Sequence, residues 1–287
     1  MLLEYTLDKQ LSILIPMYFT LTTRHAALTT RQKGIVFSIL CILMLHSSAA
    51  IADPREEAMA TVAHFTTLIT AESARARHYR LRGDAHYLLN HLDLAIADYS
   101  ECIRLDDKQD EAYFGRGMAL GRRGSIDEGI ADLSVFLKRH PNSSLAYTKR
   151  GVRYIWKGDF DNAASDLSKA VELDHNNAEA HDDLGVIHAQ KGKYSLAATH
   201  FLTTIQLDPT YQKAYHNLAM VYYLSGLPQE ALDALNAGLA LNPENRNSMM
   251  LKATILSALN RQKEAQAASD IAEFLPEGNW TERAPVR

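Results

Sequence analysis

The stretch Ala178–Tyr211, AEAHDDLGVIHAQKGKYSLAATHFLTTIQLDPTY, decides the fold, because its small and apolar residues return at the same offsets along the chain. The glycines show the period most clearly, since Gly124, Gly158, Gly192 and Gly226 follow one another at intervals of 34 residues. A fixed period of this length is typical of a repeat array, in which each unit buries its apolar face against its neighbours. The sequence therefore predicts stacked repeats rather than one or two ordinary globular domains.

Six consecutive blocks can be counted without an insertion, and they start at Ala76, Asp110, Ser144, Ala178, Gln212 and Arg246. The eighth place of each block holds a small residue, which lets two helices touch: Gly83, Gly117, Gly151, Gly185, Ala219 and Ala253. The fifteenth place holds glycine or asparagine, which tolerate the left-handed conformation that ends a helix: Asn90, Gly124, Gly158, Gly192, Gly226 and Asn260. The 24th place of the first five blocks holds a large residue: Tyr99, Leu133, Leu167, Phe201 and Leu235.

This pattern resembles the tetratricopeptide repeat (TPR) family, whose helix–turn–helix unit has the same length and the same arrangement of small and large places. The resemblance covers Ala76 to about Asn279. It implies an all-α, right-handed α-solenoid of about six helix–turn–helix repeats over residues 76–279, followed by an irregular tail over residues 280–287.

Residues 53–75 precede the first block and are predicted to contain a capping helix. Asp53 is a favourable N-cap residue and Pro54 suits the first helical position, with two glutamates in the first turn to complement the helix dipole. Apolar residues then recur at helical spacing. The segment matches the block pattern poorly, so we expect a helix over residues 54–71 that covers the open end of the array.

Residues 1–52 are predicted to be a leader that contains a secretory signal peptide. Arg31 and Lys33 precede an apolar core over residues 34–45, and Ala50-Ile51-Ala52 matches an A-x-A signal for cleavage after its last residue. The core is short for a membrane-spanning helix, which needs about 20 apolar residues. We therefore expect an exported, periplasmic protein. The alternative is an inner-membrane protein that keeps the apolar leader as its anchor.

The composition sets limits on the class of protein. With 47% hydrophobic and 22% charged residues the chain is expected to fold, and its net charge of −4 provides no general attraction to nucleic acid. Cys102 is the one cysteine outside the leader, so a disulfide framework is excluded there and Cys102 is expected to be a buried packing residue.

No stretch of the sequence carries a catalytic or nucleotide-binding motif. His181 and His188 are seven residues apart rather than the four that a helical zinc pair needs, and they occupy the fourth and eleventh places, where TPR proteins pack aromatic residues. Three aspartates recur at one place of the first three blocks and are expected to be solvated or hydrogen-bonded within the repeat: Asp98, Asp132 and Asp166. We therefore predict no catalytic residue, no cofactor and no metal.

The resemblance also implies a surface for a partner. In TPR arrays the first helix of each unit lines a concave groove through its second, fifth, ninth, twelfth and thirteenth places. Here these places include Arg77, Arg80, Tyr87, Phe114, Met118, Arg122, Thr148, Val152, Ile155, Trp156, Asp182, Val186, Gln190, His216, Met220 and Tyr223. We call these sixteen residues the predicted strip.

The predicted strip is apolar and aromatic in its middle and basic in the first block, where Arg75, Arg77, Arg80 and Arg82 cluster. We expect it to bind an extended or helical segment of a protein partner, with apolar anchors near Phe114, Met118 and Trp156 and acidic groups toward the arginines. The alternative is that some of these side chains pack between blocks and that the arginines are solvated. The family's carboxylate clamp for peptide C-termini is not assembled, because its lysine and asparagine places are filled differently.

These observations together predict a non-enzymatic protein–protein interaction scaffold or adaptor of the bacterial cell envelope. Its partner is a protein or peptide, not a nucleic acid, and it contacts the membrane only through an uncleaved leader. The first alternative is a membrane-tethered TPR assembly factor, and a lesser one is an enzyme with an unrecognised site.

Overall fold

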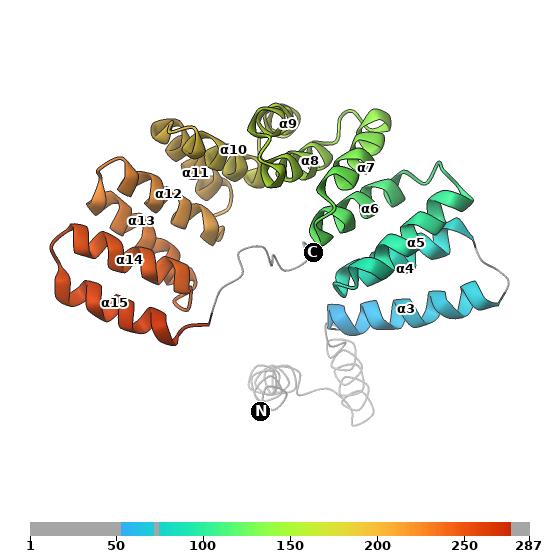
Figure 1. Cartoon of the computed structure of the whole chain (residues 1–287), viewed down its shortest axis with the longest axis horizontal. Helices are drawn as coiled ribbons and strands as arrows, with labels where there is room; N and C mark the ends of the chain where they lie inside the picture. Colours follow the sequence, from blue (N-terminus) through green and yellow to red (C-terminus); the bar gives the residue numbers. More distant parts are fainter. Residues whose placement is uncertain (1–52, 72–74, 277–287) are drawn as a thin grey trace, which may run out of the picture. The chain divides into compact units, whose positions relative to one another are not determined.

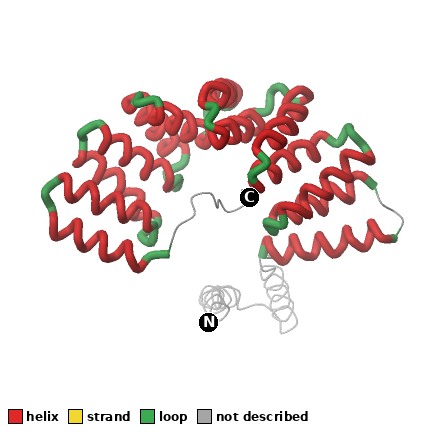
Figure 2. The backbone as a smooth tube through the Cα atoms, in the orientation of Figure 1, coloured by secondary structure: helices red, strands yellow, loops and turns green. Residues whose placement is uncertain are grey.

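A computed structural model describes residues 53–71 and 75–276. The chain divides into two units, residues 1–57 and 58–287, and the account below concerns the second unit together with the first turn of α3. The predicted signal peptide and the predicted tail over residues 280–287 lie outside the described residues. Within the described residues, all regular structure is helical (Figure 2), and none of these helices has the length and apolar character needed to cross a membrane.

Helix α3 leads into six helical hairpins that follow one another in chain order (Figure 1). The helices are α3 (Pro54–Thr70), α4 (Ala76–Leu88), α5 (Leu92–Leu105), α6 (Asp110–Arg123), α7 (Ile126–Arg139), α8 (Ser144–Lys157), α9 (Phe160–Leu173), α10 (Ala178–Gln190), α11 (Tyr194–Leu207), α12 (Gln212–Leu224), α13 (Pro228–Leu241), α14 (Arg246–Ala258) and α15 (Gln262–Phe274). Each hairpin has a helix A, from α4 to α14 in even numbers, and a helix B, from α5 to α15 in odd numbers. Every helix A begins at the residue from which its block was counted. The prediction of an all-α helical repeat fold is confirmed.

The helices end where the sequence predicts. The fifteenth place of every block has a positive φ, from 60° at Asn260 to 102° at Gly124. Only residues that tolerate the left-handed region can stand there, because a Cβ makes that conformation costly. Three helix A starts, those of α8, α10 and α14, are also capped by a side chain: Ser143, Asn177 and Asn245 each accept a hydrogen bond from a backbone N–H of the first turn.

The small eighth place and the large 24th place of one block contact each other. A Cβ placed on Gly185 would lie 2.5 Å from Cε1 of Phe201, and one placed on Gly151 would lie 2.8 Å from Cγ of Leu167. The large residues at the 24th place of the first five blocks are buried. The absence of a side chain at the eighth place, on helix A, therefore makes room for the large residue at the 24th place, on helix B. This confirms the predicted role of the small place and of the large place. Cys102 is also buried in this packing.

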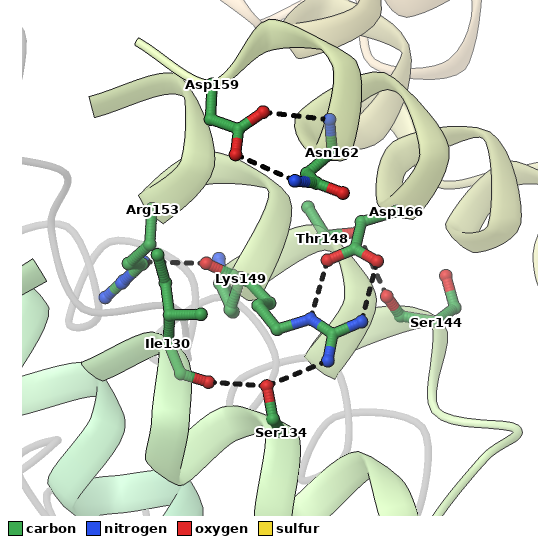
Figure 3. A network of polar contacts seen from close by, with 10 residues as sticks. Ile130, Ser134, Ser144, Thr148, Lys149, Arg153, Asp159, Asn162 and Asp166 are labelled. Carbon is green, nitrogen blue, oxygen red and sulfur yellow. Dashed lines mark hydrogen bonds and ion pairs between the residues drawn. The ribbon is translucent and has the colours of Figure 1, made fainter. Parts of the chain in front are cut away.

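The first three blocks hold a buried ion pair between helix A and helix B. Arg150 donates to Asp166 through Nε (2.7 Å) and Nη2 (2.8 Å), and its Nη1 donates to Ser134 of the preceding block at 2.9 Å. Figure 3 shows Asp166 and Ser134 in this network, where Ser134 donates in turn to the Ile130 carbonyl oxygen. The same bonds recur one block earlier, where Arg116 donates to Asp132 and Ser100. They recur again in the first block, where Arg82 donates to Asp98 and to Thr66 of α3. The recurring aspartates are thus bonded within the repeat, one of the two roles expected for them.

The fourth and fifth blocks have uncharged pairs in place of this ion pair. The place of the arginine is taken by Leu184 and Leu218, which are both buried. The place of the aspartate is taken by His200 and Ala234. One set of backbone positions therefore accepts either a charged or an uncharged pair, and the change falls at the middle of the array.

A second periodic set of ion pairs links consecutive blocks at the surface. Its three members are Arg123–Asp93 at 3.1 Å, Lys157–Asp127 at 2.7 Å and Lys191–Asp161 at 2.8 Å. All three carboxylates are largely exposed, so each pair adds little to stability.

The lead-in helix α3 shares two places with the repeat. Counting back 34 residues from the 24th and 25th places of the first block leads to Phe65 and Thr66. The Phe65 ring lies 5.9 Å from the ring of His78 in α4, and the Thr66 hydroxyl accepts a hydrogen bond from Arg82 at 3.2 Å. Helix α3 thus contacts α4 with the same two places that a helix B uses. Only these two places of α3 keep the block pattern, and the capping role of this helix stays a prediction.

The start of α3 follows the capping chemistry predicted for it. Asp53 Oδ1 accepts a hydrogen bond from the Arg55 backbone N–H at 3.0 Å, and Pro54 is the first helical residue. Ala58 is its one buried residue, so α3 contributes little to the core.

Candidate partner-binding surface

All sixteen residues of the predicted strip lie on helices A, from α4 to α12. Their exposure differs widely. Arg77, Arg122, Trp156 and Gln190 are exposed, and Trp156 retains 47% of its accessible surface. Thr148 and Asp182 are fully buried. The other ten are partly buried. Whether a partner binds along this strip stays a prediction, but the structure shows which members can meet one.

Thr148 and Asp182 are corrections to the strip, because neither presents an atom to solvent. The Thr148 hydroxyl donates to the Ser144 carbonyl oxygen and accepts at 2.9 Å from Asn177, the N-cap residue of α10. Asp182 accepts from Asn217 at 3.1 Å and pairs with Lys213 Nζ at 3.0 Å. Both side chains thus bond to the next helix A or to its N-cap residue.

Several apolar members of the strip also pack inside the array. The Phe114 ring lies 5.1 Å from the ring of Phe136 in α7. Ile155, Val186, Met220 and Tyr223 pack against buried clusters between neighbouring helices. For these residues the alternative of packing between blocks holds.

The basic end of the strip is partly neutralised. Arg82 is held by both carboxylate oxygens of Asp98, and Arg80 pairs with Asp84 of the same helix at 2.7 Å. Arg75 and Arg77 are exposed. Only part of the cluster seen in the sequence is therefore available to acidic groups of a partner.

An arginine–aromatic cluster spans the first three helices A. The Arg122 guanidinium lies 5.8 Å from the centre of the Tyr87 ring, and the Arg153 guanidinium lies 4.9 Å from the ring of Trp156. Arg153 also donates to the Met118 carbonyl oxygen at 3.2 Å, which places it against α6. These five residues come from α4, α6 and α8. We call them the Arg153 cluster.

Arg153 was missed by the sequence analysis. It stands at the tenth place of its block, which is not among the places taken to face a partner. Burial leaves it 3% exposed and lowers its pKa. A charged residue at a helix position otherwise used for packing was the available signal.

Three histidine rings meet between α10 and α11. His181 Nδ1 lies 3.2 Å from His200 Nδ1, and the His188 ring stacks on the His200 ring at 5.2 Å. Burial, together with the neighbouring His181 and His188, lowers the pKa of His200 to about 4. Burial also lowers the pKa of His216 in α12 to about 4. In the described part of the chain, no group of three or more His, Cys, Asp or Glu side chains is placed to hold a metal ion.

These histidines predict that acid destabilises the array. The unfolded chain binds protons near the ordinary histidine pKa of about 6.5, whereas folded His200 and His216 stay neutral down to about pH 4. Their contribution to stability is complete above about pH 6.5 and is lost as the pH falls toward about 4. For the well-buried His216 we expect a loss of about 1–2 kcal/mol by about pH 5.

The measurement is urea unfolding at about pH 7 and about pH 5. The double variant His200→Ala with His216→Gln should lose less stability on acidification than the wild type. Replacing the exposed His175 with glutamine is the control and should leave the loss unchanged. Equal losses in the double variant and the wild type would contradict the assignment.

Models of known protein families match most of the array. A TPR repeat model matches residues 151–192 and 185–226, and tetratricopeptide repeat models match residues 80–144 and 212–245. Together these segments cover more than half of the chain. No curated protein matches the sequence significantly.

Solved structures agree with the family models. The Cut9–Hcn1 hetero-tetramer of APC/C aligns with a TM-score of 0.63 and 19% identity, covering 77% of this chain and 46% of that chain. PilF of Pseudomonas aeruginosa aligns with a TM-score of 0.55 and 22% identity, covering 60% of this chain and 79% of that one. YrrB, a TPR protein with an unusual peptide-binding site, aligns with a TM-score of 0.52 and 23% identity, covering 66% of this chain and 97% of that chain. At these identities the likeness shows the fold alone.

The repeated hairpins, their glycine-to-knob contacts and these matches define a class of helical-repeat protein. The chain belongs to the tetratricopeptide repeat family. Proteins of this family are generally non-catalytic scaffolds, and the fold supports a role in protein–protein interaction.

Proposed function

We propose that this chain is a non-enzymatic scaffold of the bacterial cell envelope that binds a segment of a partner protein on its helices A. The observation that carries the proposal is Trp156, which stays 47% exposed on α8 with its ring 4.9 Å from the Arg153 guanidinium. Large aromatic residues in the middle of a surface are the usual anchors of protein interfaces. The exposed Arg122 of α6, the helix A of the preceding block, can add polar recognition.

The location in the envelope rests on the leader. The positive residues, the short apolar core and the A-x-A sequence before Asp53 together favour export with cleavage. Under the alternative, the uncleaved leader holds the same scaffold at the inner membrane. N-terminal sequencing of the protein from cell fractions separates the two, since cleavage predicts Asp53 as the first residue.

Affinity capture tests the binding surface. The tagged full-length chain is expressed in its own cells, and its partners are compared with those of a variant carrying Phe114→Ala, Met118→Ala and Trp156→Ala. We expect this variant to lose one or more partners, because the apolar anchors are gone. Since Phe114 also packs inside its block, the single variant Trp156→Ala is tested alongside and should lose the same partners.

The matched control removes an equal number of exposed leucines from helices B: Leu94, Leu196 and Leu202, each to alanine. This control should keep every partner. The proposal is wrong if the helix A variants recover the same partners as the wild type in equal amounts.

A further inference from the structure

Arg153 is a buried cation without a carboxylate partner. Its Nη1 donates to the Lys149 carbonyl oxygen at 3.3 Å and its Nη2 to the Met118 carbonyl oxygen at 3.2 Å. Its Nε has no hydrogen-bond acceptor, and no ion pair to Arg153 occurs among residues 53–71 and 75–276. The three arginines of the buried helix A to helix B pairs, by contrast, each hold an aspartate.

The nearest negative groups are already held by lysines. Glu179 and Asp183 of α10 both act on Arg153 electrostatically. Lys149 Nζ lies 2.6 Å from Glu179, and Lys213 Nζ lies 3.8 Å from Asp183. The charge of Arg153 is therefore not balanced by a contact within the described part of the chain. Burying an unbalanced charge is unfavourable, and an anion in contact with it offsets part of that cost.

The array leaves room for this guanidinium. A Cβ on Gly121 of α6 would lie 2.5 Å from Arg153 Nε, so the absence of a side chain at Gly121 makes space for it. The outer side is covered by the exposed ring of Trp156 at 4.9 Å. On the neighbouring helix, Arg122 is exposed beside Tyr87.

Resting on the scaffold function above, we propose that the Arg153 cluster binds an aspartate or glutamate side chain of the partner segment. The carboxylate is held by Arg153 and Arg122, and an apolar residue next to it packs on Trp156. The Trp156 ring turns aside to admit the carboxylate, because this ring is the exposed group that covers the guanidinium. A planar guanidinium with free N–H donors matches a carboxylate in both charge and geometry.

The site differs from the acid recognition expected from the sequence. That expectation placed acidic groups of the partner at the arginines of the first block, two of which are occupied by Asp84 and Asp98. The Arg153 cluster instead contains the apolar anchors Met118 and Trp156, which Arg153 contacts. The acidic and apolar parts of one short peptide can then bind at a single place.

A random dodecapeptide library displayed on phage tests the proposal with the full-length chain. We expect the selected peptides to be enriched in an Asp or Glu adjacent to an aromatic or aliphatic residue. Synthetic copies are then titrated against the variant Trp280→Phe, in which Trp156 is the one remaining tryptophan and reports on the site by its fluorescence. Changing the acidic residue of the peptide to its amide should weaken binding by about tenfold or more, because a charge-assisted pair is lost.

Variants of the chain test the residue itself. Arg153→Met should weaken binding of the acidic peptides by about tenfold or more and leave the amide peptides unaffected. Gly121→Ala keeps the charge but displaces the guanidinium, so it should weaken the same peptides even if Arg153→Met fails to fold. Arg104→Met removes an exposed charge from α5, a helix B outside the predicted strip, and is the matched control, which should bind as the wild type does.

Several results would overturn the inference. They are a selection without acidic peptides, equal binding of the acidic and amide peptides, and wild-type affinity in folded Arg153→Met. Failure of the proposed acid site can be distinguished from failure of the proposed scaffold function. If the helix A alanine variants lose their partners while Arg153→Met keeps them, the scaffold stands and the acid site does not exist.

Discussion

Replacing Asp166 with alanine is expected to lower the free energy of unfolding by about 3–5 kcal/mol, the largest effect of any single change considered for this chain. The side chain of Asp166 is 8% exposed and that of Arg150 is 19% exposed, with two hydrogen bonds between them. Without the carboxylate, the guanidinium keeps its place near Ser134 but loses its counter-charge. Removing one partner of a buried pair costs more than the pair itself contributes, because the remaining charge is left uncompensated.

A second substitution should rescue the first. Changing Arg150 to leucine in the Asp166→Ala background reproduces the pair that the fifth block already has, Leu218 with Ala234. Since the fold accepts that pair at the same places, we expect stability to return to within about 1–2 kcal/mol of the wild type.

Urea unfolding followed by far-UV circular dichroism measures both variants. Asp161→Ala in the same helix is the control, because it removes a carboxylate whose side chain is 95% exposed. It should change the urea concentration at the midpoint of unfolding very little. If the single variant is as stable as the wild type, or if the double variant is no more stable than the single one, the account of the buried pair is wrong.

Replacing Gly185 with leucine is expected to lower the free energy of unfolding by about 1–3 kcal/mol, with a value near the upper end of that range. The first added atom would lie 2.5 Å from the Phe201 ring, and that ring is 1% exposed and has no room to swing away. The helices α10 and α11 would have to separate, which disrupts the packing of the whole block. Gly185→Ala should show a smaller loss in the same direction, because alanine is tolerated at this place opposite Leu235.

Thermal unfolding of the full chain checks this prediction. Ser195→Leu adds the same side chain at an exposed position of α11 and serves as the control. Because each repeat contacts only its neighbours, the loss should appear first in the unfolding of the fourth block and the blocks beside it. A Gly185→Leu variant that melts like the wild type would show that the register of the fourth block is wrong.

Much of the fold could be predicted from the sequence because its signals are local or strictly periodic. The start of each helix A and the positive φ at Asn90 and Asn260 depend on residue type at a fixed place. The contact between Gly185 and Phe201 was predictable from small and large places that recur in the first five blocks. The match of α3 was missed because only Phe65 and Thr66 keep the pattern there.

The candidate site was harder to predict because side-chain partners depend on how helices approach one another. The sequence showed that Asp166 belongs to a periodic set, but not that Arg150 would hold it with two bonds. Thr148 and Asp182 occupy places that face a partner in related arrays, yet here they bond to the N-cap residue of α10 and to a residue of α12. Arg153 stands at a packing place, so no motif marks it.

The sequence by itself determined the repeat, its length, the helix ends and the small-to-large contact within each block. These features follow from backbone conformation and side-chain size, which each residue carries with it. Only the tertiary structure decided which charges are paired and which are not. Lys149 and Lys213 pair with the acidic groups near Arg153. The absence of a side chain at Gly121 leaves space for the Arg153 guanidinium next to the Trp156 ring. Such pairings are set by distances of a few ångströms between separate helices, which no pattern along one helix contains.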